Sequence, residues 1–345
     1  MRHIEFHNRE KEMKKIRDIL DAEPSLITFV YGPINSGKTT TISHLIKELP
    51  EDYTPFYVNL RGRFITDYED FLNVLFEIDE EGEVGNVTEY VKLALKDLGA
   101  VSGIPIPINL FEQIFEKKDK SKDMFKYIER FFMEISKTRT PILIIDELQV
   151  IGDLKIDGLL IYKLFNFFIR LTKELHLAHI FVITSDSLFI ERVYSEAMLE
   201  GRCRYLLVDD FDNSTTINFL DKYKFSDMEK EVAWNYCGGK PVCLVELINA
   251  RENRKRKAEE MLKIRKGQIE EIVYSLEAKD KKMFNAVVEV LSEFKLKEKT
   301  GYKYLSDGIK FLVGKNIIFA DSANKELRPQ SKLNLLAVRE VIADA

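Results

Sequence analysis

The fold of this chain is decided by the stretch Gly32-Pro33-Ile34-Asn35-Ser36-Gly37-Lys38-Thr39, which fits the phosphate-loop pattern G-x-x-x-x-G-K-S/T at every fixed position. Before it, Leu26–Tyr31 is a β-branched and aromatic run of strand length, and after it Thr40–Leu49 has helical apolar spacing. In a strand–loop–helix unit, the loop amides and the positive end of the helix converge on phosphate oxygens. A glycine turn that matches by chance would not explain the flanking strand and helix.

Two side chains of this loop are expected to contact the nucleotide or its metal directly. Lys38 would place a point charge between the β- and γ-phosphates, and Thr39 would place a hydroxyl on a magnesium ion. The sequence therefore predicts a site for ATP or ADP with Mg²⁺. The predicted binding residues are Gly32, Pro33, Asn35, Ser36, Gly37, Lys38, Thr39 and Thr40.

Two carboxylates follow an aliphatic run further along the chain. Pro141–Ile145 describes a strand buried on both faces, and Asp146 and Glu147 come at its carboxyl end, where ligands of open parallel sheets bind. Asp146 is predicted to hold magnesium across from Thr39. Glu147 is predicted to polarise the water that attacks the γ-phosphate. The alternative is a pair of surface acids after a buried strand.

Two further candidates come from the strands that follow. Ser185 ends the run that begins at His179, and its hydroxyl is a candidate to bond the γ-phosphate or the attacking water, although strand ends are commonly polar. Arg202 precedes the expected strand Tyr205–Val208, and an arginine near transferred phosphate stabilises transition-state charge. A solvated arginine is the alternative, and the choice between Arg202 and Arg204 stays open.

Composition indicates a globular protein without a membrane span. The 345 residues are 45% hydrophobic and 32% charged, which is enough chain for two or three domains. Three cysteines lack metal-ligand spacing, and no apolar run approaches about 18 residues, so we expect a cytoplasmic protein. Residues 250–345 carry 21 Lys and Arg against 15 Asp and Glu, whereas residues 1–249 carry 31 against 42. This asymmetry is a weak hint of an anionic partner.

Expected strands and helices alternate up to about residue 210, which predicts a parallel, doubly wound α/β domain. Within it, residues 100–117 alternate apolar residues with proline and predict an edge strand or hairpin, as a packed satellite or a partner surface. Beyond Phe211 the sequence predicts three short helices, a charged linker helix over residues 251–266, and then helices followed by a β-hairpin. That last order is typical of a winged helix-turn-helix. The expected C-terminal elements are helices Glu270–Glu277, Lys279–Lys295, Lys299–Lys303 and Leu305–Lys315 and strands Ile317–Asp321 and Glu326–Pro329.

The motifs together resemble the archaeal ATPases of the STAND branch of AAA+ proteins. The matching segments occur in the family order: Asn8–Glu12, the phosphate loop, Ile144–Glu147, Gly201-Arg202 and Gly238-Gly239-Lys240-Pro241. The resemblance implies an α/β AAA+-type P-loop sheet with helices on both faces, a helical lid and a winged helix, with domains at 1–211, 212–262 and 263–345. It also implies that Arg9 lies near the base, that Arg202 faces the γ-phosphate and that Pro241 packs against adenine. Thr184-Ser185 stands where the family has Gly-Ser, which puts the role of Ser185 in doubt.

Three functions fit these features. The first is an ATP-binding and ATP-hydrolysing switch in which nucleotide controls the lid and winged helix, as a monomer or a nucleotide-dependent oligomer. The second is a DNA-binding protein that uses ATP as a structural ligand, akin to origin-recognition initiators, with the helix Leu305–Lys315 in the major groove. The third, a small-molecule kinase, is disfavoured by the long C-terminal parts. Lysines proposed for duplex DNA are Lys295, Lys297, Lys299, Lys303 and Lys310; a protein-binding or autoinhibitory winged helix is the alternative.

Overall fold

The protein is described by a computed structural model that covers residues 4, 6–80, 86–94, 101–116, 120–151, 159–196, 199–251 and 253–343. The sequence also predicts a helix over about Ile156–Glu174 and an acidic loop at Asp79–Glu83; the start of that helix and most of that loop lie outside these ranges. Within them, none of the helices combines the length and apolarity that crossing a membrane would need.

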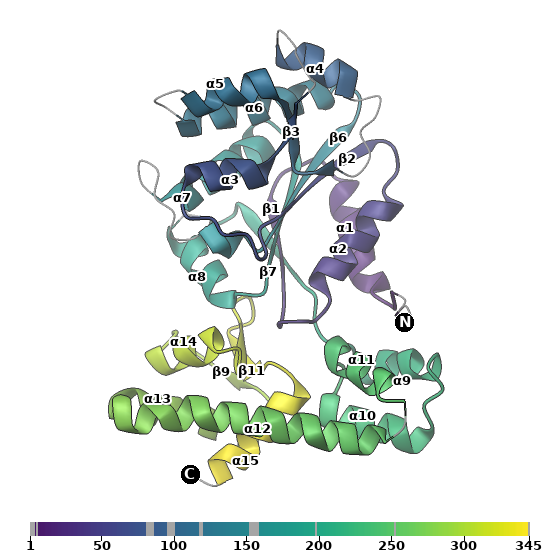
Figure 1. The fold of residues 1–345 in the computed structure, drawn as a ribbon, viewed down its shortest axis with the longest axis vertical. Helices are drawn as coiled ribbons and strands as arrows, with labels where there is room; N and C mark the ends of the chain where they lie inside the picture. Colours follow the sequence, from purple (N-terminus) through teal and green to yellow (C-terminus); the bar gives the residue numbers. More distant parts are fainter. Residues whose placement is uncertain are drawn as a thin grey trace.

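A six-stranded parallel sheet forms the centre of the molecule, in the order β4–β2–β6–β7–β1–β8 (Figure 1). Every residue of β1 and β7 is buried, which explains why these strands read as continuous apolar runs. The expected α/β sheet is confirmed. The family resemblance implies a core of five strands, and the short edge strand β4 is a sixth. The strands are β1 (Ile27–Tyr31), β2 (Tyr53–Asn59), β4 (Val101–Ser102), β6 (Thr140–Asp146), β7 (His179–Thr184) and β8 (Cys203–Leu207).

Helices cover both faces of this sheet. On one face, α1 (Glu10–Leu20) and α2 (Lys38–Glu48) pack their apolar sides against the inward residues of β1, β6 and β7 (Figure 1). A larger core lies on the other face, and its helices include α3, α6, α7 and α8. These are α3 (Tyr68–Leu75), α6 (Lys120–Ile135), α7 (Leu160–Ile169), which continues into the π-helical turn Arg170–Glu174, and α8 (Ser187–Glu196); the turn Leu148–Ile151 follows β6.

The proline-alternating segment forms a small separate sheet. β5 (Ile104–Pro107) pairs in parallel with β3 (Phe76–Asp79), and α4 (Val87–Ala94) and α5 (Ile108–Glu116) flank them. Ile104 and Ile106 are buried in the larger core, and the Tyr127 hydroxyl donates to the Pro105 carbonyl at 2.6 Å. For the described residues, the segment therefore packs as a satellite on its own domain.

Three short helices follow the sheet as expected and form the lid. α9 (Asn213–Asp221) is capped by Asp212, α10 (Asp227–Cys237) begins with a capping box between Ser226 and Glu229, and α11 (Pro241–Asn249) begins with proline. Their apolar faces form a separate small core. The sequence predicts the third of these helices over Pro241–Arg256, and in the structure it is shorter and ends at Asn249.

The C-terminal region differs from the expectation at three points, the third of which is a final helix, α15 (Lys332–Ala343), that the sequence did not predict. A single helix, α12 (Arg254–Lys279), replaces the linker helix and the separate helix Glu270–Glu277, and it passes through the expected boundary at residues 262–263. The expected helix Lys299–Lys303 is instead β9 (Thr300–Gly301), the edge of an antiparallel sheet ordered β10–β11–β9. The remaining elements are α13 (Lys281–Ser292), α14 (Asp307–Gly314), β10 (Ile318–Asp321), β11 (Glu326–Pro329) and α15 (Lys332–Ala343).

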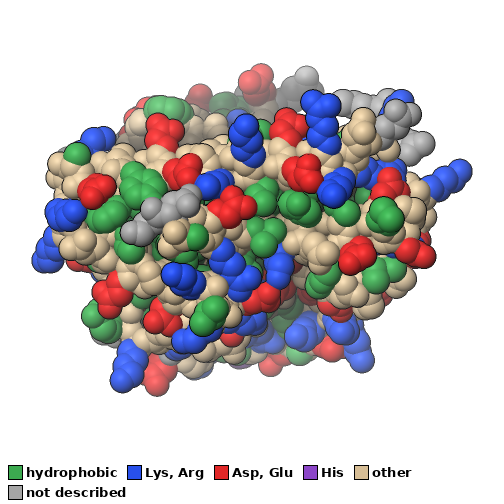
Figure 2. Space-filling model, turned by 90° about the horizontal axis from the view of Figure 1, so that it is seen from below, with side chains coloured by type: hydrophobic (Ala, Val, Ile, Leu, Met, Phe, Trp, Pro, Cys, Tyr) green, Lys and Arg blue, Asp and Glu red, His purple; other side chains and the backbone are tan. Residues whose placement is uncertain are grey.

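The continuity of α12 has a packing reason. Ala258 is buried in the lid core, whereas Ile269 and Val273 are buried in the C-terminal core, so one helix contributes to both. In Figure 1, α12 runs beneath the lid and the C-terminal domain. Seen from that side, in Figure 2, Lys and Arg side chains are interspersed with Asp and Glu and form no continuous basic stripe.

Candidate functional site

The phosphate loop leaves the carboxyl end of β1 and ends where α2 begins, at Lys38. Both fixed glycines are required by the backbone. Gly32 has φ 154°, and a Cβ there would lie 2.2 Å from the Val208 carbonyl oxygen; Gly37 has φ 95°. The buried Ser36 hydroxyl donates to the same Val208 carbonyl at 2.7 Å. The loop is thus fixed against the end of β8, while Thr40 lies exposed in the first turn of α2.

Lys38 is buried against its own loop. Its Nζ donates to the carbonyl oxygens of Gly32 at 3.0 Å and Pro33 at 2.9 Å, and only 5% of the residue is exposed. The pKa of Lys38 is lowered from 10.5 to about 8, mainly by burial and then by the positive charge of Lys240, while the charges of Glu147 and Asp146 oppose the shift. A phosphate placed against this ammonium would restore its preference for the charged form.

The proposed metal ligands lie side by side. Thr39 Oγ1 donates to Asp146 Oδ2 at 2.8 Å, and the Tyr57 hydroxyl donates to the same oxygen at 2.8 Å. The other carboxylate oxygen, Oδ1, is buried without a hydrogen-bond partner, and burial raises the pKa of Asp146. An unsatisfied carboxylate oxygen beside the loop hydroxyl fits a hard cation such as Mg²⁺, which prefers oxygen ligands.

Glu147, the residue after Asp146, has a left-handed backbone with φ 63°. Its side chain points toward a cluster of polar groups. Arg61 Nη2 lies 2.5 Å from Glu147 Oε1, and Gln149 Nε2 donates to Oε2. Ser185 Oγ donates a hydrogen bond to Glu147 Oε1 at 3.3 Å, and Thr184 Oγ1 donates one to the Gln149 amide oxygen at 2.9 Å. The structure therefore brings Ser185 to Glu147.

Arg9, which the resemblance places near the base, lies against the phosphate loop. Its Nη2 donates to the Ser36 carbonyl at 2.5 Å, and its guanidinium lies 4.7 Å from the centre of the Phe211 ring. Asn8 does not cap α1, because the helix begins after Arg9; its Nδ2 donates instead to Thr215 Oγ1 of the lid at 2.5 Å.

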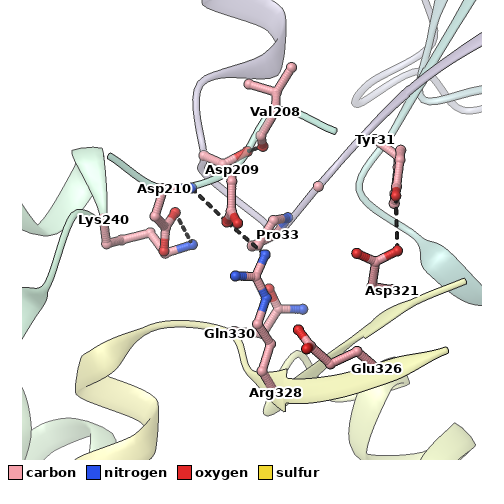
Figure 3. Close-up of polar contacts among 12 residues, drawn as sticks. Tyr31, Pro33, Val208, Asp209, Asp210, Lys240, Asp321, Glu326, Arg328 and Gln330 are labelled. Carbon is pink, nitrogen blue, oxygen red and sulfur yellow. Dashed lines mark hydrogen bonds and ion pairs between the residues drawn. The ribbon is translucent and has the colours of Figure 1, made fainter. Parts of the chain in front are cut away.

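The lid reaches the loop through Lys240. Its Nζ donates to the Ile34 carbonyl at 3.0 Å and lies 2.9 Å from Asp210 Oδ1, and the residue is 3% exposed (Figure 3). Pro241 is the next residue and the first of α11. The predicted adenine contact is therefore adjacent to the loop, whereas the direct contact is made by the lysine before it.

Arg202 does not lie at this site. β8 runs parallel to β1 with Cys203 opposite Ile27, so the residue before β8 lies at the amino end of the sheet. The Arg202 carbonyl accepts from Ile27 N at 3.1 Å, and Arg204 Nη2 donates to Ser25 at 3.1 Å. The loop leaves the opposite end of β1, about 15 Å away along the strand. The expectation that Arg202 or Arg204 faces the γ-phosphate of its own chain is therefore wrong for this arrangement.

Comparison with known proteins shows the family of this chain. Residues 6–247 match the family model described as "ATPase domain predominantly from Archaea". The chain belongs to this archaeal ATPase family. Residues 255–342 match "Uncharacterized ATP-binding protein MJ1010-like, C-terminal domain". An uncharacterized ATP-binding protein of Pyrococcus abyssi is 50% identical over 338 residues, covering 98% of each chain, and one of Methanocaldococcus jannaschii is 46% identical over 353 residues, also covering 98% of each.

Solved structures support this fold. The Walker-type ATPase of Pyrococcus abyssi aligns with a TM-score of 0.62 at 17% identity, over 97% of this chain and 96% of that one. The Aeropyrum pernix ORC2 protein, solved as ADPNP–ADP complexes, aligns with a TM-score of 0.50 at 12% identity, over 99% and 95%. At these identities the likeness shows the fold alone.

Sequence reasoning missed several residues of the candidate site, among them Tyr57, Arg61 and Lys240. Tyr57 and Arg61 come from the end of β2 and the turn after it, and Lys240 lies inside the Gly-Gly-Lys-Pro break. Of these residues, only Lys240 could have been found from the sequence, because it is a cation placed between two glycines and a proline in the lid. The other two depend on β2 pairing with β6, which places Asn59 opposite Asp146.

Proposed function

We propose that this archaeal ATPase binds ATP with Mg²⁺ and hydrolyses it slowly, as a switch in which the nucleotide sets the position of the lid and C-terminal domain. The observation that carries the proposal is the contact between Thr39 and Asp146, with the second Asp146 oxygen buried and unpartnered. A loop hydroxyl and a strand-end carboxylate are the two protein ligands that this chemistry requires. Membership of the STAND branch and a winged-helix C-terminal domain are part of the proposal.

Binding relies on the loop and the residues next to it. The backbone amides around Ser36 and Gly37 and the Lys38 ammonium would hold the phosphates. Thr39 and Asp146 would hold magnesium, which would neutralise charge on the phosphate oxygens. Arg9 and Pro241 are the residues proposed beside the base.

Hydrolysis would use Glu147 as the base. Glu147 accepts a proton from a water, the water oxygen bonds to the γ-phosphorus, and the bond to the β–γ bridging oxygen breaks to give ADP and phosphate. Arg61, Gln149 and Ser185 orient the carboxylate. Because the Arg61 ion pair competes for the same carboxylate that must accept the proton, slow turnover is expected.

The switch needs a group whose contacts differ between nucleotide states. Lys240 is the candidate, because its ammonium is shared between the Ile34 carbonyl and Asp210, and a phosphate would compete for it. Pro241 follows directly, so a movement of Lys240 moves α11.

Binding of duplex DNA, with ATP as a structural ligand, is the second candidate. The lysine-rich turn before α14 and the net charge of the C-terminal region favour it. However, Lys297 pairs with Glu293 at 3.0 Å and Lys299 with Glu326 at 2.9 Å. α14 also packs against α8 of the core. These ion pairs reduce the charge available for phosphate contacts.

ATP turnover by the purified protein, with and without duplex DNA, tests the proposal. Glu147→Gln should retain ATP binding and lose turnover, and Lys38→Ala should lose binding. Normal hydrolysis by the Glu147→Gln variant would contradict the catalytic assignment. DNA-independent turnover supports the switch, whereas tight DNA binding without turnover supports the second candidate.

A further inference from the structure

The C-terminal hairpin contacts the phosphate loop and the residue before it, at one point each; Figure 3 shows the first of these contacts, between Tyr31 and Asp321. The hydroxyl of Tyr31, the residue before Gly32, donates to Asp321 Oδ1 at the end of β10, at 2.9 Å. Within the loop, the Ile34 N–H donates to the side-chain oxygen of Gln330, just after β11, at 3.0 Å. The first half of the loop is therefore held by a domain about 290 residues further along the chain.

The orientation of Gln330 is determined by its other contacts. The residue is 4% exposed, its Nε2 donates to the Ile318 carbonyl at 3.1 Å, and its backbone N–H donates to the Ile317 carbonyl at 3.1 Å. With the amide nitrogen committed to a carbonyl, the amide oxygen must face Ile34. The Ile34 N–H, one of the loop amides available to phosphate, is thereby occupied by a protein oxygen.

Both backbone polar groups of Ile34 are bound by parts of the chain outside the core. Gln330 accepts from its N–H, and Lys240 of the lid donates to its carbonyl. Two consecutive acids after β8 extend this arrangement: Asp209 pairs with Arg328 of the hairpin at 2.6 Å, and Asp210 pairs with Lys240 at 2.9 Å. The lid and the hairpin thus form ion pairs with two consecutive acidic residues beside the loop.

Lid and C-terminal domain are also built as one unit. α12 contributes to both cores, Leu262 packs against both, and Leu333 of α15 lies in the lid core. Arg254 of α12 pairs with Glu229 of the lid at 2.7 Å. A lid movement driven by nucleotide would therefore carry the hairpin with it, because α12 runs from the lid helices to the C-terminal elements (Figure 1).

The junction between hairpin and loop is only partly packed. Phe319 is buried against the core, with its ring centre 6.3 Å from that of Tyr31, which gives the docked state an apolar contact. Beside it, a cavity of about 300 Å³ is lined by Pro33, Trp234 and Gln330, among others. The loop itself is therefore held mainly by polar bonds, which a competing anion could replace.

We propose that Asp321, Arg328 and Gln330 form a latch on the phosphate loop, and that the latch and the nucleotide triphosphate compete for the Ile34 N–H. ATP binding then releases the C-terminal unit, and docking of that unit weakens ATP binding by the same factor. This inference rests on the proposed function, because it assumes that phosphates occupy this loop. It specifies which residues regulate the site.

The test measures binding of a magnesium complex of a non-hydrolysable ATP analogue by calorimetry and by the fluorescence of Trp234. That residue is the chain's single tryptophan and lines the junction cavity. Gln330→Ala should tighten analogue binding by about 2- to 10-fold, the effect of one hydrogen bond. In the wild type, analogue binding should shift Trp234 emission as the cavity opens.

Arg339→Gln is the matched control. It removes a bond whose two partners both belong to the C-terminal domain, from Arg339 Nε to the Phe294 carbonyl at 3.1 Å, so it should not change docking on the core. It should leave the affinity closer to wild type than Gln330→Ala does. Thermal unfolding checks each variant, and Arg328→Gln, which should also tighten binding, serves if Gln330→Ala does not fold.

Unchanged or weaker analogue binding by folded Gln330→Ala and Arg328→Gln would overturn the latch. If Lys38→Ala still lost binding in that case, the proposed function would stand. If the wild type gave no binding heat and Lys38→Ala behaved identically, the proposed function itself would fail, and the latch with it.

Discussion

Lys38 should make the stability of this protein depend on pH in a predictable direction. Its pKa in the folded state is about 8, against 10.5 when exposed. The unfolded chain therefore binds the proton more tightly, and protonation favours unfolding. The cost of burying the protonated Lys38 is fully present below about pH 8, and the free energy of unfolding rises as pH increases from about 8 to 10.5. Between pH 7.5 and 9.5 these two values correspond to a gain of about 2 kcal/mol.

Urea unfolding of the wild type and of Lys38→Met at both pH values measures this contribution of Lys38 to the free energy of unfolding. The variant keeps the apolar stem and lacks the charge, so titrations of tyrosines and cysteines cancel in the comparison. We expect the wild type to gain about 2 kcal/mol more than Lys38→Met on going to pH 9.5. An equal pH dependence in the two proteins would show that Lys38 is not desolvated as the structure indicates.

Three other substitutions test separate parts of the site. Tyr57→Phe removes one of two hydrogen bonds to Asp146 and should lower the free energy of unfolding by about 1 kcal/mol in urea titrations; no loss would mean that the bond does not form. Gly32→Ala places a Cβ 2.2 Å from a carbonyl oxygen and should cost about 2–3 kcal/mol, whereas Gly314→Ala, with open space around it, should not destabilise; equal thermal stability of the two variants would contradict this. Arg202→Ala should leave the ATP turnover of dilute protein unchanged, and a large loss would restore Arg202 to the site.

The parts of the site that the sequence predicted are those fixed by local pattern. The phosphate loop is defined within eight residues, and Asp146 and Glu147 follow directly from a buried strand. Arg202 was misplaced because a residue before a strand and a residue after it lie at opposite edges of a parallel sheet. The edge at which Arg202 lies depends on the parallel pairing of β8 with β1, and this pairing is a property of the tertiary structure that the local sequence does not reveal.

The remaining contacts depend on segments far apart in the chain. Gln330 reaches Ile34 across 296 residues, and Arg61 reaches Glu147 across 86. Neither residue type is distinctive in its own segment. The division of α12 into two expected helices was wrong for another reason. The run of charges over residues 251–266 suggested a separate linker, whereas Ala258 and Ile269 are buried in two different cores that the one helix connects.

The uninterrupted α12 also constrains how the chain can vary in length. Each residue added to or removed from an α-helix turns everything beyond it by about 100° and shifts it by about 1.5 Å. Between Ala258 and Ile269, such a change would rotate the hairpin away from Ile34 even with every side chain intact. Spacing within this helix therefore matters to the nucleotide site as directly as the identity of the residues that line it.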